Sequence, residues 1–170
     1  IELRLELSEH LPQIHAVASE MTQVLVNLAV NAIQSMPNGG VLTIRTLPEA
    51  DAVLLTVEDT GVGMSEESQR RLFTPFYTTK DIGEGTGLGL SVVLGIVSAH
   101  GGTIHVESAP NCGSRFEIRL PAVNAADGVS IIIPILMFLL YLTNSSSRSS
   151  ITSRRIIFAC ISSWRFVING

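Results

Sequence analysis

The sequence contains few cysteines and none of the common short signatures of a metal or redox site. Its two cysteines, Cys112 and Cys160, lie far apart, and neither belongs to a C-x-x-C or Cys/His cluster. This spacing argues against a disulfide framework and a structural zinc site, and we expect a reducing, cytoplasmic environment. The N-terminal residues lack a secretory signal pattern, and Ile1 already falls in an expected strand. We therefore expect the chain to start at a boundary within a longer protein.

An excess of basic residues is also missing from most of the chain. Residues 1–121 contain seven Lys/Arg and fourteen Asp/Glu, whereas residues 122–170 contain four Arg and one Asp. An acidic region of this length argues against a nucleic-acid-binding surface. With 170 residues and 46% hydrophobic content, the chain can form one core. We expect a globular domain over residues 1–121 and a tail of different character over residues 122–170.

Glycines are concentrated before an apolar run, in the stretch "GEGTGLGLSVV" that begins at Gly83. Glycine permits positive φ and close approach to a ligand, and a glycine loop that leads into a helix presents free N–H groups to an anion. The stretch does not match G-x-x-x-x-G-K-[ST], and no three of its glycines fit G-x-G-x-x-G. It therefore predicts phosphate binding of a less common kind.

Hydrophobic periodicity predicts the secondary structure. Apolar residues alternate with charged ones over residues 1–7, which indicates a strand, and they follow a helical period from Met21 to Met36 before "PNGG". The remaining expected elements are two hairpins, a short helix start and a second long helix: Val41–Leu47 with Ala52–Asp59, Ser65–Ser68, Leu88–His100, and Thr103–Ser108 with Ser114–Leu120. This order predicts an α/β (α+β) two-layer sandwich with a mixed, mostly antiparallel sheet and its helices on one face.

Amides lie along one edge of the first helix. Gln23, Asn27 and Asn31 are spaced by four, so their side chains form a stripe beside the apolar face. A solvated helix flank would also explain them. An amide oxygen can, however, complete the coordination of a phosphate-bound Mg²⁺.

A carboxylate lies at the end of the second strand of the first hairpin. Asp59 shares the parity of the apolar residues Val53, Leu55 and Val57, so it should face the core, where a carboxylate needs a donor. The exocyclic amine of a purine would provide one, and the glycines that follow leave room for a planar group. An Asp that caps its own turn is the alternative.

Aromatic and hydroxyl side chains with one lysine precede the glycine loop, in "LFTPFYTTK" from Leu72 to Lys80. A mobile lid with a phosphate-seeking Lys80 would have this composition. A loop that Phe73 and Phe76 pin to the core is the alternative, and it is compatible with a lid.

Together these motifs resemble a known family over about residues 1–121. "NLAVNA" (Asn27–Ala32), "DTGVG" (Asp59–Gly63), "FTPFYTTK" (Phe73–Lys80) and "GTGLGL" (Gly85–Leu90) resemble the N, G1, F and G2 boxes of the ATP-binding domain of sensor histidine kinases. "HGGTIHVESAPNCGSRFEIRLP" (His100–Pro121) is similar to the end of that domain, and "PFYTTK" is most similar to the nitrogen-regulation subgroup. The resemblance implies the Bergerat ATP-binding fold, shared with gyrase and mismatch-repair ATPases.

The resemblance also implies roles for individual residues with ATP and Mg²⁺. Asp59 would accept a hydrogen bond from the adenine amine, with Gly63 beside it and Ser114 assisting through water. Asn31 would hold Mg²⁺, and Asn27 would support it or touch phosphate. Lys80 and Thr86 would meet the outer phosphates. The full set expected to bind ATP is Asn27, Asn31, Asp59, Gly61, Gly63, Lys80, Gly85, Thr86, Gly87, Leu88, Gly89 and Ser114.

The position of Asn27 bears on the reaction. By resemblance, ATPases and serine kinases of this superfamily use a glutamate four residues before the magnesium asparagine as a general base, and an amide cannot take that proton. A neutral histidine is nucleophilic without such a base, so Asn27 favours phosphoryl transfer to histidine over hydrolysis. A stand-alone ATPase or serine kinase and a degenerate, non-catalytic interaction module are the alternatives.

The phosphoacceptor itself is expected elsewhere. We expect structural roles for His10, His15, His100 and His105, because none of them begins an H-E-[LIF] pattern. The chain is thus expected to bind ATP and to need a dimerisation/phosphoacceptor domain as partner, with a response regulator downstream and with monomer as its own default state.

The tail carries two apolar segments, Val129–Leu142 and Ile156–Ile168, on either side of serine and arginine residues. Val129–Leu142 contains Pro134 and is shorter than the ~20 residues of a spanning helix. A membrane-associated hairpin is one hypothesis. A non-native or unpacked extension is the one that we favour, because the second segment contains Arg165.

Overall fold

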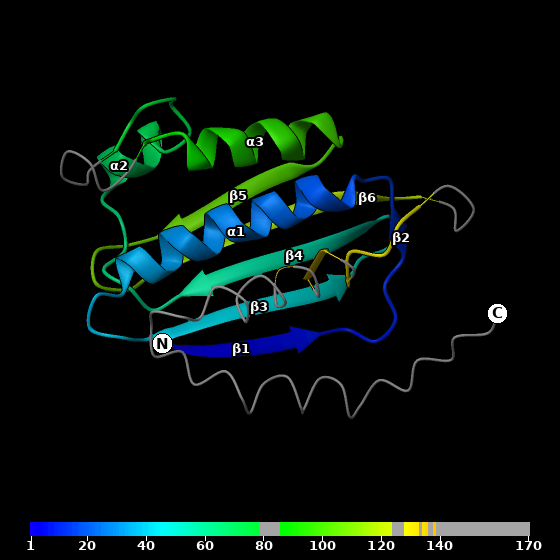
Figure 1. Cartoon of the computed structure of the whole chain (residues 1–170), viewed down its shortest axis with the longest axis horizontal. Helices are drawn as coiled ribbons and strands as arrows, with labels where there is room; N and C mark the ends of the chain where they lie inside the picture. The colour runs from blue at the N-terminus through cyan, green and yellow to red at the C-terminus, as the bar shows by residue number, and fades with distance from the viewer. Residues whose placement is uncertain (79–85, 124–127, 133, 136–137, 139–170) are drawn as a thin grey trace.

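The computed structural model describes residues 1–78, 86–123, 128–132, 134–135 and 138 (Figure 1). The strands and helices over these residues, in chain order, are β1 (Glu2–Leu7), β2 (Gln13–Ile14), α1 (Ala18–Ser35), β3 (Val41–Pro48), β4 (Ala52–Asp59), α2 (Glu66–Arg71), α3 (Gly89–Ala99), β5 (Thr103–Ser108) and β6 (Ser114–Val123). The two expected hairpins and the two expected long helices are all present.

The strands form one mixed, mostly antiparallel sheet. Its path runs β1-β3-β4-β6-β2, and β5 also pairs with β6. Among the strands of the described residues, only the β1–β3 pair is parallel, with Leu3 opposite Leu42; the other pairs are antiparallel. In the register of the two central strands, Asp59 lies opposite Ser114. Asp59 at the end of β4 and Ser114 at the start of β6 therefore lie side by side at one end of the sheet.

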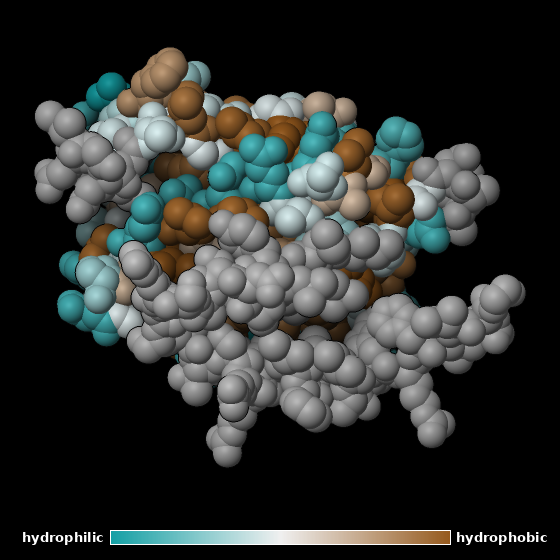
Figure 2. Space-filling view, viewed as in Figure 1, coloured by the Kyte–Doolittle hydropathy of each residue, from teal (hydrophilic) through white to brown (hydrophobic). Residues whose placement is uncertain are grey.

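The long helices α1 and α3 pack against each other on one face of this sheet (Figure 1). The buried side of α1 meets the alternate inward side chains of the strands, and α3 adds Val93 and Val97. Hydrophobic side chains remain visible along α3, beside the more hydrophilic outer side of α1 (Figure 2). These layers confirm the expected two-layer fold. The buried residues of α1 are Met21, Val24, Leu25, Leu28, Ala29 and Ala32.

Differences from the expected elements are confined to their ends and to one short strand. Helix α1 begins at Ala18 rather than Met21, because the N–H groups of Glu20 and Met21 already donate to the carbonyl of Val17. Strand β2 has only two residues, too few for a periodic pattern, and was not predicted. Ser65 caps α2 by accepting from the Ser68 N–H, as its position before two glutamates indicates.

The first residues of the expected tail belong to the core. Strand β6 runs two residues beyond the boundary expected at Pro121, and Val129 exchanges both backbone hydrogen bonds with Ile14. The side chains of Ile131, Ile135 and Phe138 are fully buried within the core cluster. The expectation of an unpacked tail is therefore wrong for these residues, which cover apolar surface that water would otherwise meet.

The second apolar segment, Ile156–Ile168, lies outside the described residues. Within the ranges that the structure does describe, no helix combines the length and the apolar character needed to cross a membrane.

Truncation of a buried side chain after residue 128 should destabilise the domain. We expect Ile135→Ala to lower the free energy of unfolding by about 2–4 kcal/mol, because it removes methyl groups from a packed core. The control is Leu47→Ala, which truncates a side chain that is 45% exposed and should change stability by less than about 0.5 kcal/mol. Urea unfolding followed by circular dichroism measures both. Equal, small effects would contradict a core position for Ile135.

Candidate functional site

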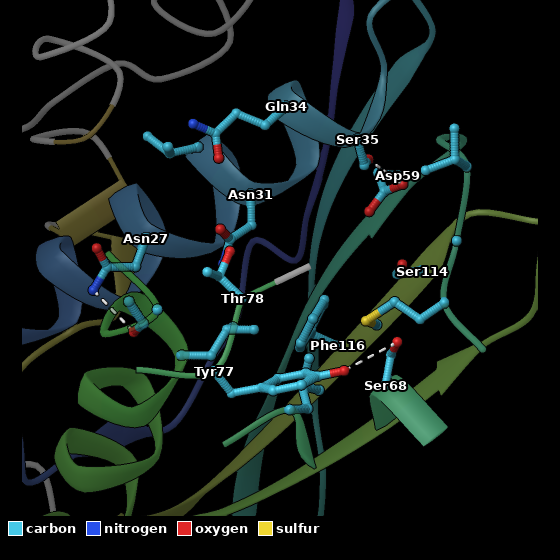
Figure 3. Close-up of a pocket in the computed structure, with 18 of the residues that line it drawn as sticks. Asn27, Asn31, Gln34, Ser35, Asp59, Ser68, Tyr77, Thr78, Ser114 and Phe116 are labelled. Atoms are coloured by element: carbon cyan, nitrogen blue, oxygen red, sulfur yellow. Dashed lines mark hydrogen bonds between the residues drawn. The ribbon is translucent and has the colours of Figure 1, made fainter. Parts of the chain in front are cut away.

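A pocket opens where α1, the ends of β4 and β6, and the start of α3 converge (Figure 3). Its volume is about 540 Å³, within the range typical of small-molecule sites. Asp59 and Ser114 lie at one end, and Asn27 lies toward the other, beside Gly89. The pocket is therefore polar at both ends, with Phe116 and other apolar side chains between them.

Asp59 is the buried carboxylate of the pocket, with 5% of its surface exposed. Its Oδ1 accepts two hydrogen bonds, from the Ser35 hydroxyl at 2.9 Å and from the Gly61 N–H at 2.8 Å. Burial raises the pKa of the Asp59 carboxyl above its ordinary value, and these donors, with the Ser114 N–H, oppose the rise. The carboxylate thus remains partly uncompensated, as expected for a group that awaits a donor from a ligand.

The β5–β6 turn supports the same end of the pocket. Ser114 is 7% exposed, and its hydroxyl lies 3.1 Å from that of Ser108, which donates to the Gly113 carbonyl and accepts from the Met64 N–H. Gly63 has φ +64° and fits against the turn, where a Cβ would lie 1.9 Å from the Ala109 oxygen. This contact requires glycine at position 63.

The two asparagines of α1 are half-buried and line the pocket. The Asn27 amide donates to the Gly89 carbonyl at 3.3 Å, which ties α1 to the first turn of α3. The Asn31 side chain makes no hydrogen bond among those found within the described part of the chain. Its amide is therefore available to a ligand.

The segment before α3 is held at its two described ends. The Phe76 N–H donates to the Gly87 carbonyl at 2.9 Å. Gly87 has φ +65°, and a Cβ there would lie 2.5 Å from the Phe76 carbonyl carbon. Thr86 and Gly87 both line the pocket. Lys80 and Gly85, which were expected to meet phosphate, lie outside the described residues.

The aromatic residues of this segment have different positions from those expected. Phe73 packs against the core, but Phe76 is 74% exposed and does not pin the loop. Tyr77 lines the pocket instead, with its hydroxyl 3.4 Å from that of Ser68 and the Arg71 guanidinium 4.4 Å from its ring centroid. An aromatic wall of the pocket is thus held by α2.

Most of the residues predicted from the sequence come together in the pocket. Gly61 does not line the pocket itself but donates its N–H to Asp59, which does. Leu88 is the N-cap of α3 and does not line the pocket, and Gln23 is exposed on α1. Those that line the pocket are Asn27, Asn31, Asp59, Gly63, Thr86, Gly87, Gly89 and Ser114.

Sequence reasoning missed three pocket residues of α1, Val30, Gln34 and Ser35. The signal was present, because a spacing of four from Asn27 and Asn31 leads next to Ser35. The stripe predicted from the sequence instead runs back to Gln23, one turn outside the pocket.

None of the four histidines lines the pocket. His100 joins the two long helices: its Nε2 accepts from the Val17 N–H at 3.1 Å, and its Nδ1 lies 2.8 Å from the Ile96 carbonyl oxygen.

Comparisons with known proteins agree with this geometry. Residues 16–124 match the family model described as "Histidine kinase-, DNA gyrase B-, and HSP90-like ATPase". The chain is 43% identical over 136 residues to the sensor kinase CckA of Brucella abortus (strain 2308) and 44% identical over 121 residues to the sensor histidine kinase ZraS of Escherichia coli (strain K12). Each match covers 71% of this chain, but only 14% and 26% of the relative.

Solved structures show the same fold. The catalytic domain of histidine kinase ThkA superposes with a TM-score of 0.63 at 32% identity, over 72% of this chain and 81% of that domain. Full-length ShkA in complex with AMPPNP superposes with a TM-score of 0.64 at 30% identity, over 73% of this chain and 26% of that protein.

The buried carboxylate should make stability depend on pH. Because the pKa of Asp59 is raised on folding, the folded chain binds this proton more tightly than the unfolded chain, and stability is lost as the pH rises through the folded-state pKa. We therefore expect Asp59→Asn to be at least as stable as the wild type at pH 7, with an advantage that shrinks as the pH falls toward 4. Urea unfolding of both proteins across this range measures the difference. An advantage that grows on acidification would contradict the raised pKa.

Proposed function

Because the chain belongs to the family of histidine kinase-, DNA gyrase B- and HSP90-like ATPases, we propose that it binds Mg-ATP in this pocket. We propose further that it supplies the γ-phosphoryl group to a histidine on a separate dimerisation/phosphoacceptor domain, in two-component signal transduction. Membership of the family implies ATP as the nucleotide. The magnesium ion, the acceptor and the direction of transfer are proposals that rest on the residues of the pocket.

The Asp59 end of the pocket suits the adenine base. Its buried carboxylate retains acceptor capacity, because a carboxylate can accept about four hydrogen bonds and the donors are the Ser35 hydroxyl and the Gly61 N–H on Oδ1, with the Ser114 N–H. The exocyclic amine of adenine is a donor of matching kind, and a hydrogen bond to a buried carboxylate is stronger than one between neutral groups. Ser114 at the same end of the pocket would assist through water, and Gly63 would lie beside the planar ring.

The other end suits the phosphates. Asn31 presents an amide oxygen, which is a ligand that Mg²⁺ accepts together with phosphate oxygens and water. The N-terminus of α3 at Gly89 presents the N–H groups of the first helical turn and the positive end of the helix dipole. Bound there, Mg²⁺ would neutralise phosphate charge. We propose Thr86, Gly87, Leu88 and Gly89 as phosphate contacts, and we extend the proposal to Lys80 and Gly85.

The nature of residue 27 carries the proposal for histidine as acceptor. Asp59 is the one carboxylate among the described residues that line the pocket, and it lies at the base end. At the phosphate end, the Asn27 amide is already committed as a donor to the Gly89 carbonyl, and it has no lone pair basic enough to take a proton from water or serine. A neutral imidazole needs no such base.

The similar proteins support this choice. The curated relatives reported above are named sensor kinases, and ShkA was solved with AMPPNP, an ATP analogue. We propose that this chain, which spans 14–26% of their length, is the ATP-binding part of a similar kinase that acts in the cytoplasm. The wording "PFYTTK" supports the nitrogen-regulation-like subgroup within it.

Nucleotide binding by the full chain tests the proposal. A fluorescent ATP analogue should bind saturably, be displaced by ATP and bind more tightly with Mg²⁺. Asp59→Asn should weaken ATP binding about 10- to 100-fold, which corresponds to one hydrogen bond to a charged group. Asn31→Ala should abolish most of the gain from Mg²⁺ while leaving magnesium-free binding nearly unchanged.

Transfer is tested with γ-labelled ATP and a histidine phosphoacceptor domain taken from a sensor kinase. We expect acid-labile label on the acceptor and little free phosphate without it. Rapid phosphate release without an acceptor would instead indicate an ATPase. Absence of binding by a folded chain would indicate a non-catalytic module.

A further inference from the structure

Ser35 occupies the junction between the helix and the carboxylate, and none of the motifs assigns it a role. It is the last residue of α1 and lines the pocket, four residues after Asn31 and eight after Asn27. Residues at this spacing lie on one face of a helix and, at 1.5 Å per residue, Asn27 and Ser35 are about 12 Å apart along its axis. One helix face therefore reaches both ends of the pocket.

The Ser35 hydroxyl has two acceptors within reach and one proton to donate. Oδ1 of Asp59 is 2.9 Å away, and the Ala32 carbonyl oxygen is 2.7 Å away. A carboxylate is the stronger acceptor. A hydroxyl that bonds the carbonyl three residues back is also common in helices without any role in a site. The contact with Asp59 thus needs a second observation before it indicates function.

The backbone supplies that observation. The Val62 N–H donates to the Ser35 carbonyl at 3.0 Å. The side chain of Ser35 thus binds Asp59, and its main chain binds the turn that follows Asp59. The turn also presses directly on this residue, since a Cβ on Gly61 would lie 2.1 Å from the Ser35 hydroxyl oxygen. This close packing holds the carboxylate in one place relative to α1 (Figure 3).

Resting on the proposed function, we propose that Ser35 is a positioning residue for recognition of the base. Its hydroxyl, together with the Gly61 N–H, holds Oδ1 of Asp59 and leaves Oδ2 directed to the exocyclic amine of adenine. Ser35 does not touch the base in this arrangement. It sets the orientation of the group that does, from the same helix that carries the phosphate-end asparagines.

The charges around Asp59 agree with this role. Burial raises the pKa of the carboxyl, Glu58 raises it further, and the donors from Gly61, Ser35 and Ser114 lower it. Among the described residues, Glu58 is the charged group whose repulsion raises the pKa of Asp59. Removal of the Ser35 hydroxyl should therefore raise the pKa of Asp59. As the pH is lowered, the variant should then lose ATP binding at a higher pH than the wild type does.

The test compares ATP with purine riboside triphosphate, which lacks the exocyclic amine. We expect Ser35→Ala to weaken ATP binding about 3- to 10-fold, as for the net contribution of one hydrogen bond, and to leave binding of the analogue within about 2-fold. Ser35→Cys keeps the size of the side chain with a much weaker donor, and it should resemble Ser35→Ala. The control is Thr22→Val, which removes a hydroxyl that bonds the Ala18 carbonyl of the same helix and should affect neither ligand.

As the pH is lowered, Ser35→Ala should lose ATP binding at a higher pH than the wild type does. Carboxyl NMR of the nucleotide-free chain should show a higher pKa for Asp59 in this variant. The inference would be overturned, and the proposed function left intact, if Ser35→Ala weakened binding of ATP and of the analogue equally. The same holds if the ratio of the two affinities and the pH dependence of ATP binding both stayed as in the wild type. A folded wild-type chain that binds neither ligand would overturn both.

Discussion

The packing of α1 on the inner face of the sheet is the contact on which the rest of the structure depends. One side of this helix is buried against the strands, and burial of apolar surface is the dominant favourable contribution to folding. The adjoining edge carries Asn27, Asn31 and Ser35. Because a helix is rigid, the depth and rotation set by the apolar side also set where these polar groups lie. Core and site are thus two sides of one element.

The sheet completes the site from the opposite direction. Asp59 and Ser114 are opposite each other in the β4–β6 register, and both face the core. A slip by one residue would turn Asp59 to solvent and remove it from the pocket. The long run of apolar pairs along these strands prevents such a slip. The position of the carboxylate is therefore secured by the hydrophobic pattern, while its charge opposes that burial.

This opposition explains why stability and recognition make different demands at Asp59. Removal of the charge relieves a buried carboxylate but also removes the strongest acceptor in the pocket. Ser35, Gly61 and Ser114 reduce the penalty by donating to the carboxylate, and the first two share Oδ1. At the phosphate end, an amide at position 27 joins the helices and provides no base. Under the proposed function, the pocket would bind ATP without supplying a base for its hydrolysis.

The amino-acid sequence by itself determined the two hairpins, the two long helices and the inward parity of Asp59, because periodicity and turn chemistry are local properties. It pointed to Gly87 and Gly89, which line the pocket. It also carried the family resemblance that the match over residues 16–124 confirms. Only the tertiary structure decided that β2 forms, that Ile131, Ile135 and Phe138 enter the core, and that Ser35 rather than Gln23 continues the polar stripe. These features depend on which surfaces meet across long stretches of chain, and no local pattern encodes that.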